Sequence, residues 1–491
     1  MQAGMKRSLF LFFALLSLLL AAGLTYNEWQ TYQSVQRALP DGTRMAGLPV
    51  GGLDVQAAGL RVAQLYSLTP IELRYDGQVI HLAPEQVGFA LDLQGMLAEA
   101  QDASPWSFGD YLFNRGRAPG QVPLQASLDT ARLEAYLRDQ IAPRLSSPPS
   151  APRPSAPGDL TLLPGRPGQQ MDLSGAQAAV EAALFSPDQR VVELNVRAVN
   201  PLPAQFADLE PMLEAVLQSG GFSGAFELYL QDLASQQVIR LAYNHGQRIP
   251  PGIAFTGAST IKIPVMVSAF RQIDGDLPAG LRVQMEQMID LSDNGSTDEV
   301  LQMALNSVNA PLLVTADMRA LGLESTFLAG YFYQGAALLD LVSTPANTRS
   351  DVSTDPDMYN QTTPAEIGWL LGAIETCAAG EGGPLIETFA GQITQPECQT
   401  MVEMLKNNRK AVLIENGLPE GTPLAHKYGW VTDFNDGLMH TASDAGVVYS
   451  PAGRFVLSVY LYDPDQLQWD GAQLLVSRLA RAAYNFYNYE E

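Results

Sequence analysis

The stretch TGASTIKIPVMVSAF, residues 256–270, decides how the sequence is interpreted. Its apolar run is typical of a buried helix, and Ser259 and Lys262 stand three residues apart at its start. On a helix this spacing brings a hydroxyl and an ammonium to one face, within hydrogen-bond reach. A lysine whose pKa is lowered by burial can act as the base that a serine nucleophile needs, and a helix start offers backbone N–H groups to a developing oxyanion. The pattern predicts a reactive Ser259 with Lys262 as its base.

Two further segments downstream carry polar residues that suit the same chemistry. In LSDNGSTDEVLQMAL, residues 291–305, the hydroxyl of Ser292 could relay a proton and the amide of Asn294 could hold a substrate amide. The alternative is a helix N-cap, for which Ser and Asp before an apolar run are common. Lys427 and Gly429 open an expected strand ahead of a hairpin. A cation there can bind a carboxylate and a glycine admits substrate backbone, although an ordinary edge-strand lysine is the alternative.

In this order, the S-x-x-K, S-D-N and K-x-G motifs resemble those of class A β-lactamases and related penicillin-binding proteins. The resemblance covers about residues 208–491 and includes the segments TTPAEIGWLL and SDAGVVYSPAGRFVLSVY. It implies an α+β fold, with an antiparallel sheet flanked by helices plus a helical subdomain. It also implies roles for seven residues: Ser259 as acylated nucleophile, Lys262 as base, Ser292 as proton shuttle, Asn294, Lys427 and Gly429 as substrate contacts, and Trp430 as the second oxyanion-hole N–H donor beside that of Ser259.

Two departures from the family pattern affect the expected chemistry. The third motif reads K-Y-G, so Tyr428 replaces the small hydroxyl residue that helps to bind the substrate carboxylate. The glutamate that activates the deacylating water in class A enzymes is also missing, because no glutamate occurs between Glu324 and Glu366. The loop offers only aspartates, and losing a general base typically costs about 10²–10⁴ in rate. Acylation is therefore expected and fast deacylation is not, with four candidate replacements in the loop: Asp340, Asp351, Asp355 and Asp357.

The N-terminus predicts export from the cytoplasm. Lys6 and Arg7 precede an apolar run from Leu9 to Leu24 within an uncharged stretch at 8–27. This pattern fits a signal peptide or one membrane span, and its length favours an uncleaved anchor over cleavage followed by secretion. The positive-inside rule then leaves residues from about 27 onward outside the cytoplasm.

An oxidising compartment makes a disulfide between Cys377 and Cys398 plausible, with two separate buried thiols as the alternative.

Between the membrane segment, residues 1–27, and the hydrolase-like domain, 205–491, we expect a small α+β region at 28–204. It resembles a peptidoglycan-binding domain of bacterial envelope proteins in its VGGLDV opening, a hairpin at Asp76-Gly77, and the segments PEQVGFALD and PGRPGQQMD. A spacer that holds the next domain away from the membrane is the alternative. The proline-rich stretch 146–159 predicts an exposed connector, since proline interrupts helices and ladders.

Composition excludes several other classes of protein. The 491 residues carry a net charge of −23, which disfavours nucleic acid as a partner. Two cysteines and four histidines without metal-ligand spacing predict neither a metal site nor a cofactor. The expected partner is a β-lactam or a peptidoglycan-like small substrate, with possible cell-wall contact. Three functions stay open: a β-lactamase-like hydrolase, a D-Ala-D-Ala carboxypeptidase or esterase, and a non-catalytic wall-binding protein.

Overall fold

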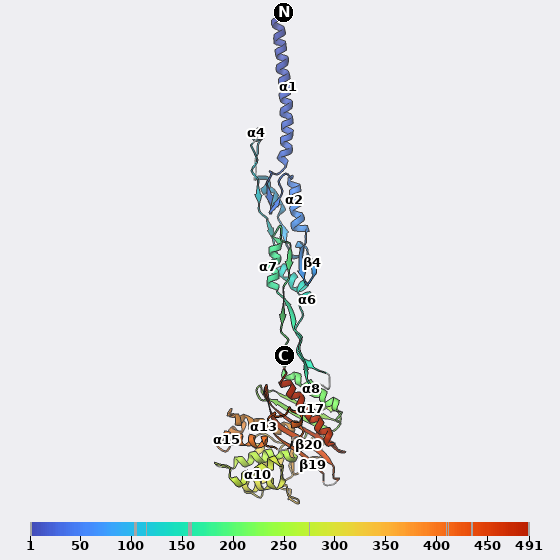
Figure 1. Ribbon diagram of the computed structural model, residues 1–491, viewed down its shortest axis with the longest axis vertical. Helices are drawn as coiled ribbons and strands as arrows, with labels where there is room; N and C mark the ends of the chain where they lie inside the picture. Colours follow the sequence, from blue (N-terminus) through green and yellow to red (C-terminus); the bar gives the residue numbers. More distant parts are fainter. Residues whose placement is uncertain are drawn as a thin grey trace. The chain divides into compact units, whose positions relative to one another are not determined.

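The chain divides into two compact units, which are described separately (Figure 1). The computed structural model describes residues 2–102, 106–113, 115–155, 160–273, 275–408, 410, 412–433 and 436–489. The first unit comprises Met1–Ser150 and Arg166–Leu202, and the second comprises Ala151–Gly165 and Pro203–Glu491.

The first unit begins with a long helix and continues as small sheets with short helices. Helix α1, Gln2–Arg37, contains the apolar run and is long and apolar enough to cross a membrane. Behind it, one hydrophobic core joins the remaining elements except α4, which packs against α1. Their bounds are β1 Arg44–Met45, β2 Leu48–Pro49, α2 Val55–Ala63, β3 Ile71–Tyr75, β4 Gln78–Leu82, β5 Ala90–Leu91, α3 Leu93–Asp102, α4 Phe108–Leu112, β6 Gln121–Val122, β7 Ala126–Ser127, α5 Thr130–Tyr136, α6 Ala142–Leu145, β10 Gly168–Met171, α7 Leu173–Leu184, β11 Val191–Glu193 and β12 Val196–Val199.

The hairpin expected at Asp76-Gly77 is confirmed. Strands β3 and β4 pair antiparallel up to Tyr75 and Gln78, leaving a two-residue turn. Both turn residues have positive φ, 47° at Asp76 and 75° at Gly77, as the tight primed turns of hairpins require.

The proline-rich stretch contains a short ladder, contrary to the expectation that its prolines would prevent one. Strand β8, Arg153–Pro154, pairs antiparallel with β9, Leu162–Leu163. A two-residue strand at a sheet edge tolerates proline, because only one side needs hydrogen bonds. Leu162 is buried in the second unit's core. The segment Ala151–Gly165 therefore belongs to the second unit, although it lies within the range 28–204 expected for the N-terminal region.

A six-stranded antiparallel sheet organises the second unit. Its strand order is β15-β14-β13-β21-β20-β19, so strands from the two ends of the unit meet in the middle. Strand β13 pairs with β21 from Ala225 opposite Tyr462 to Asp232 opposite Phe455. This arrangement confirms the expected antiparallel sheet flanked by helices. The strand bounds are β13 Ala225–Asp232, β14 Val238–Asn244, β15 Gln247–Arg248, β19 Leu424–Thr432, β20 Met439–Ser450 and β21 Gly453–Tyr462.

Helices cover both faces of this sheet, because its strands alternate buried side chains between two cores. One core includes Phe226 and Leu228 and packs under α8, Leu209–Gly220, and α17, Trp469–Tyr487. The other core lies on the opposite face, under the inserted helices (Figure 1). The bounds of those helices are α9 Lys262–Arg271, α10 Ala279–Asp290, α11 Asn294–Leu305, α12 Ala310–Ala320, α13 Pro364–Ala379, α14 Pro384–Thr388 and α15 Gln395–Lys406. A further short helix, α16 Ile414–Gly417, packs in the first core instead.

A disulfide bond links Cys377 on α13 to Cys398 on α15, as the export signal made plausible. Replacing both cysteines by alanine is expected to lower the free energy of unfolding by about 3 kcal/mol, because the bond closes a loop with a sequence separation of 21. Urea unfolding of the variant and of the oxidised protein measures this loss. Reduction of the unmodified protein is the control and should produce a similar shift. Equal urea midpoints for the oxidised protein and the variant would contradict the prediction.

Candidate active site

Ser259 lies in a single 3₁₀ turn, Ala258–Ile261, which leads directly into α9. In a 3₁₀ turn the side chains at i and i+3 eclipse, which suits the Ser259–Lys262 pair even better than the expected α-helix. The Nζ of Lys262 is 3.2 Å from the Oγ of Ser259. Ala258, just before the serine, has φ 49°, a left-handed conformation that costs energy in a residue other than glycine and is often found at functional sites.

Lys262 is fully buried, and its amine is surrounded by oxygen atoms. Besides the Ser259 hydroxyl, Nζ lies 2.6 Å from the carbonyl oxygen of Ser292, 2.9 Å from Oδ1 of Asn294 and 3.3 Å from Oγ of Ser292. Burial lowers the pKa of Lys262 to about 7, against the opposing effect of Asp293 and Asp298. A neutral amine has two hydrogens and one lone pair. It can donate to the carbonyl and to the amide oxygen while its lone pair accepts the Ser259 proton.

The segment that contains Ser292 and Asn294 fulfils both sequence interpretations at once. Asp293 is the N-cap of α11, and its carboxylate accepts from the backbone N–H of Ser296 at 2.6 Å. Ser292, with φ 61°, and Asn294 on either side of the cap face Lys262. The N-cap alternative therefore holds for Asp293, whereas its two neighbours contribute to the lysine's surroundings.

Strand β19 brings Lys427 and Gly429 to the same place. Lys427 is fully buried, which excludes an ordinary edge-strand lysine, and its Nζ donates to Oγ of Ser292 at 3.0 Å. Burial lowers the pKa of Lys427 well below its usual value, and the charge of Lys262 lowers it further. At Gly429 the strand passes close to the serine, because an added Cβ would lie 2.8 Å from the backbone N of Ser259.

Tyr428 does not line the cavity described below, although it stands in the K-Y-G motif where the family has a small hydroxyl residue that helps to bind the substrate carboxylate. Along β19 its side chain faces away from Gly429 and packs in the core under α17. Its ring stacks on Trp430 with centroids 5.1 Å apart, and among the described residues its buried hydroxyl has no hydrogen-bond partner. The phenol therefore neither blocks the cavity nor replaces the missing small hydroxyl.

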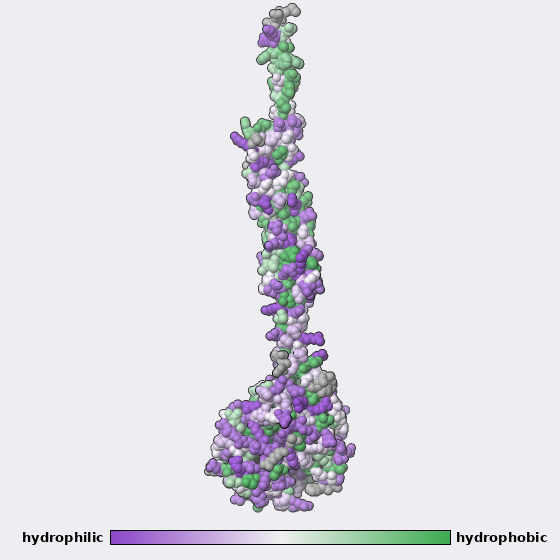
Figure 2. All heavy atoms as spheres, viewed as in Figure 1, coloured by the Kyte–Doolittle hydropathy of each residue, from purple (hydrophilic) through white to green (hydrophobic). Residues whose placement is uncertain are grey.

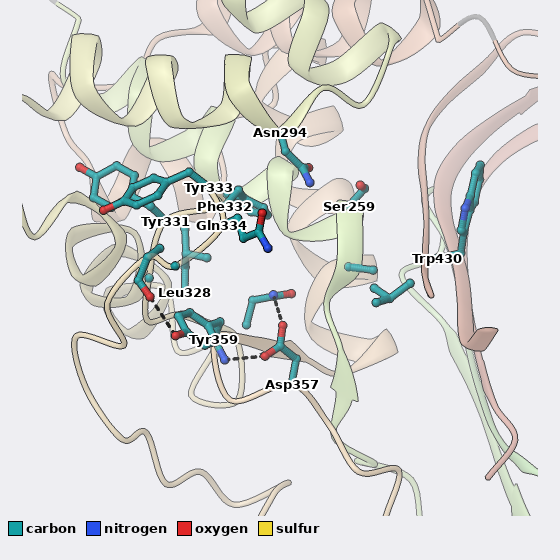
Figure 3. Close-up of a pocket in the computed structure, with 16 residues that line it drawn as sticks. Ser259, Asn294, Leu328, Tyr331, Phe332, Tyr333, Gln334, Asp357, Tyr359 and Trp430 are labelled. Carbon is teal, nitrogen blue, oxygen red and sulfur yellow. Dashed lines mark hydrogen bonds between the residues drawn. The ribbon is translucent and has the colours of Figure 1, made fainter. Parts of the chain in front are cut away.

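A cavity of about 520 Å³ opens over Ser259. Figure 3 shows Ser259 between aromatic side chains of one loop and Trp430 on β19. The aromatic residues are Tyr331, Phe332 and Tyr333, and the ring of Phe332 lies 5.7 Å from Nζ of Lys262. Sequence reasoning assigned no role to this loop, although three consecutive aromatic residues between Gly330 and Gly335 are an available signal for a binding loop.

Of the four aspartates that could replace the missing glutamate, Asp357 lines this cavity. Its carboxylate accepts from the backbone N–H of Tyr359 at 2.9 Å and from Nδ2 of Asn360 at 3.0 Å (Figure 3). Burial raises the pKa of Asp357. Asp351 instead pairs with Arg349 at 2.6 Å. Asp355 lines a neighbouring cavity, and Asp340 is exposed.

The described residues also allow a statement on metals. Within the described ranges, no group of three or more His, Cys, Asp and Glu side chains is placed to hold a metal ion.

An amine with a pKa near 7 can take a proton from a hydroxyl 3.2 Å away, and this is the chemistry of a serine hydrolase. The model of the beta-lactamase enzyme family matches residues 208–487, more than half of the chain, and the chain belongs to this family. It is a β-lactamase-like serine hydrolase, as the order of its motifs had indicated.

Among solved structures, a beta-lactamase from Chitinophaga pinensis is 16% identical, with 57% of this chain and 98% of that chain covered and a TM-score of 0.42. The structure of PBP-A is 18% identical, with 59% of this chain and 98% of that chain covered and a TM-score of 0.40. An ancestral class A beta-lactamase is 20% identical, with 56% of this chain and 98% of that chain covered and a TM-score of 0.40. No curated protein matches the sequence significantly.

Proposed function

We propose that this protein is an extracytoplasmic serine hydrolase that forms an acyl-enzyme through Ser259 on a β-lactam or a related peptidoglycan-like amide. The observation that carries the proposal is the Lys262 amine, fully buried, with a pKa of about 7 and 3.2 Å from the serine hydroxyl. A lysine that only stabilised the fold would have no need to be neutral beside a serine that lines a cavity.

In the proposed acylation, Ser259 Oγ bonds to the substrate carbonyl carbon and its proton passes to Lys262 Nζ. The carbonyl electrons move onto oxygen, where the backbone N–H groups of Ser259 and Trp430 stabilise the charge. When the electrons return, the carbon–nitrogen bond breaks. The leaving nitrogen takes a proton from the hydroxyl of Ser292, which recovers one from Lys262, 3.3 Å away. The products are a serine ester and an amine.

Substrate binding is assigned to the groups that face the serine from β19 and α11. Lys427 attracts a substrate carboxylate and orients the Ser292 hydroxyl through their 3.0 Å hydrogen bond. Gly429 leaves room for substrate backbone along the strand, and the amide of Asn294 holds a substrate amide. The aromatic loop at 331–333 supplies apolar surface for the remainder of the substrate.

Hydrolysis of the ester is assigned to a water molecule activated by Asp357, which takes one proton of the water as the water oxygen attacks the ester carbon. The bond from this carbon to Ser259 Oγ then breaks, the proton held by Asp357 returns to Oγ, and the product leaves as a carboxylic acid. Asp357 is the one carboxylate that the described residues contribute to the cavity wall. Beside it, Oδ1 of Asn360 is buried without a hydrogen-bond partner among the described residues, and it offers the water a second contact. Asp357 already accepts two hydrogen bonds, so we expect slow deacylation.

Replacing Asp357 by asparagine is expected to lengthen the lifetime of the acyl-enzyme about 10²-fold and to leave the rate of acylation unchanged, because only the second step needs this base. Release of a fluorescent penicillin from the labelled protein measures the lifetime. The matched control is Asp351→Asn, since Asp351 is exposed and pairs with Arg349. An unchanged lifetime in the Asp357 variant would mean that water attacks without this carboxylate.

The location is proposed from the N-terminal helix. The apolar part of α1 is long enough to cross a membrane, and Lys6 and Arg7 precede it. We assign it as an uncleaved anchor with the hydrolase domain outside the cytoplasm.

Kinetics with two probes test the function as a whole. Rapid turnover of a chromogenic cephalosporin would indicate a β-lactamase, whereas stoichiometric labelling by a fluorescent penicillin with slow release would favour a D-Ala-D-Ala carboxypeptidase or an esterase. The two hydrogen bonds already made to Asp357 favour the second outcome. Absence of any labelling would exclude the proposal and leave a non-catalytic wall-binding protein.

A further inference from the structure

Helix α1 continues without a break beyond its apolar run, and its last turns are packed against the folded first unit. Trp29 and Tyr32 of α1 contact the ring of Phe108 on α4, with centroid distances of 5.0 and 5.3 Å. Tyr32 also donates to the carbonyl oxygen of Trp106 at 2.7 Å, and Tyr111 donates to Glu28 at 2.8 Å. The helix therefore ends in an aromatic cluster and is not a loose tether.

The position of this cluster along α1 can be compared with the thickness of a bilayer. The uncharged stretch 8–27 spans about 30 Å at roughly 1.5 Å per residue, which is the thickness of the hydrocarbon core. Trp29 follows two residues later and Tyr32 five, so both lie within about 8 Å of the hydrocarbon edge. Aromatic side chains concentrate at this level because their apolar bodies and polar tips suit the headgroup region.

Next to the cluster, α4 presents large apolar side chains to the outside. Leu112 is 52% exposed and Phe113, the next residue after α4, is 78% exposed, while Tyr32 in the aromatic cluster is 5% exposed. Ser107 caps α4 and fixes the turn, since its Oγ accepts from the backbone N–H of Asp110 at 3.1 Å. Figure 2 shows the apolar colour along the N-terminal part of α1, and Figure 1 shows α4 beside the later part of this helix.

We propose that the segment from Trp106 to Phe113 is a second membrane contact, in which Leu112 and Phe113 enter the headgroup region of the bilayer that α1 spans. The partner is a lipid surface, and the proposal rests on the assignment of α1 as an anchor, not on the hydrolase chemistry. The first unit is then attached to the membrane at two places, by α1 and by the segment from Trp106 to Phe113, whereas a single helix attaches it at one.

Depth-dependent quenching tests this contact in the full chain, reconstituted in vesicles of phosphatidylcholine and phosphatidylglycerol. A fluorophore is attached to Phe113→Cys and, as matched control, to Leu68→Cys, since Leu68 is 75% exposed in the same unit and both native cysteines are disulfide-bonded. Nitroxide lipids labelled near the headgroup should quench the probe at 113 at least threefold more than the probe at 68. Equal quenching at the two positions would overturn the proposal.

A second measurement tests whether Leu112 and Phe113 themselves bind the bilayer or only lie close to it. A probe at Gly109→Cys reports on α4, where an added Cβ meets only Oγ of Ser107, at 3.6 Å. Adding Leu112→Asp and Phe113→Asp should reduce its quenching, whereas Leu68→Asp should not. Unchanged quenching after the double substitution would overturn the proposal. An unchanged far-UV circular dichroism spectrum and unchanged urea unfolding report that the first unit is still folded.

Discussion

Replacing Ser259 by alanine is expected to abolish covalent labelling by a fluorescent penicillin, because the oxygen that forms the ester is removed. Hydrolysis of any substrate should fall by about 10⁶-fold, the cost of removing a serine nucleophile from a comparable machinery. Labelling is measured by gel fluorescence and by the mass of the intact protein, which should increase by one acyl group only in the unmodified chain.

The matched control for this experiment is Ser353→Ala, since Ser353 is an exposed serine in the loop that precedes Asp357. Its labelling should equal that of the unmodified protein. Retention of the label in the Ser259 variant, at the same stoichiometry, would remove this residue as the nucleophile and with it the proposed acylation.

Replacing Lys262 by methionine, which preserves length and removes the amine, is expected to slow acylation by about 10²–10⁴-fold. The pH dependence gives a sharper test. Burial lowers the pKa of Lys262 to about 7, and only the neutral amine can accept the serine proton. In the unmodified protein the acylation rate should therefore rise about tenfold per pH unit below 7 and level off above it.

The Lys262→Met variant should lose this rise, because the group that titrates is absent. Lys406→Met is the control, since Lys406 is exposed and its Nζ lies over the ring of Tyr449, 3.8 Å from the centroid. Stopped-flow measurement of acylation between pH 5 and 9 separates these outcomes. A rate that falls as pH rises through 7, or a variant that keeps the wild-type profile, would contradict the role of Lys262 as base.

The sequence was sufficient to predict that distant residues meet at one site, because three motifs occurred in the order of a known family. Ser259, Lys262, Ser292 and Lys427 are joined by side-chain distances of 3.0–3.3 Å, although 168 positions separate the first from the last. The sheet that brings them together was also predictable, since its strands have clear apolar patterns at the two ends of the unit.

Other features depend on tertiary contacts that no local pattern encodes. The burial of Tyr428 depends on the core under α17 that covers its face of β19 and on the ring of Trp430, which stacks on its own. Asp351, Asp355 and Asp357 belong to one loop, and the path of that loop decides that only Asp357 lines the cavity over Ser259. The loop leads into a small sheet formed by β16, Phe255–Thr256, β17, Phe327–Leu328, and β18, Asn360–Thr362. The ladder at Arg153–Pro154 likewise depends on where its partner strand lies.

The pairing of β13 with β21 has a consequence for biogenesis. A strand from the beginning of the second unit is completed only by one that is synthesised more than 200 residues later, at 453–462. The sheet against which the Ser259 turn packs therefore cannot close until the chain has been synthesised as far as Tyr462. A shorter nascent chain contains Ser259 without the strands that position its neighbours, so its hydroxyl cannot yet react as a nucleophile.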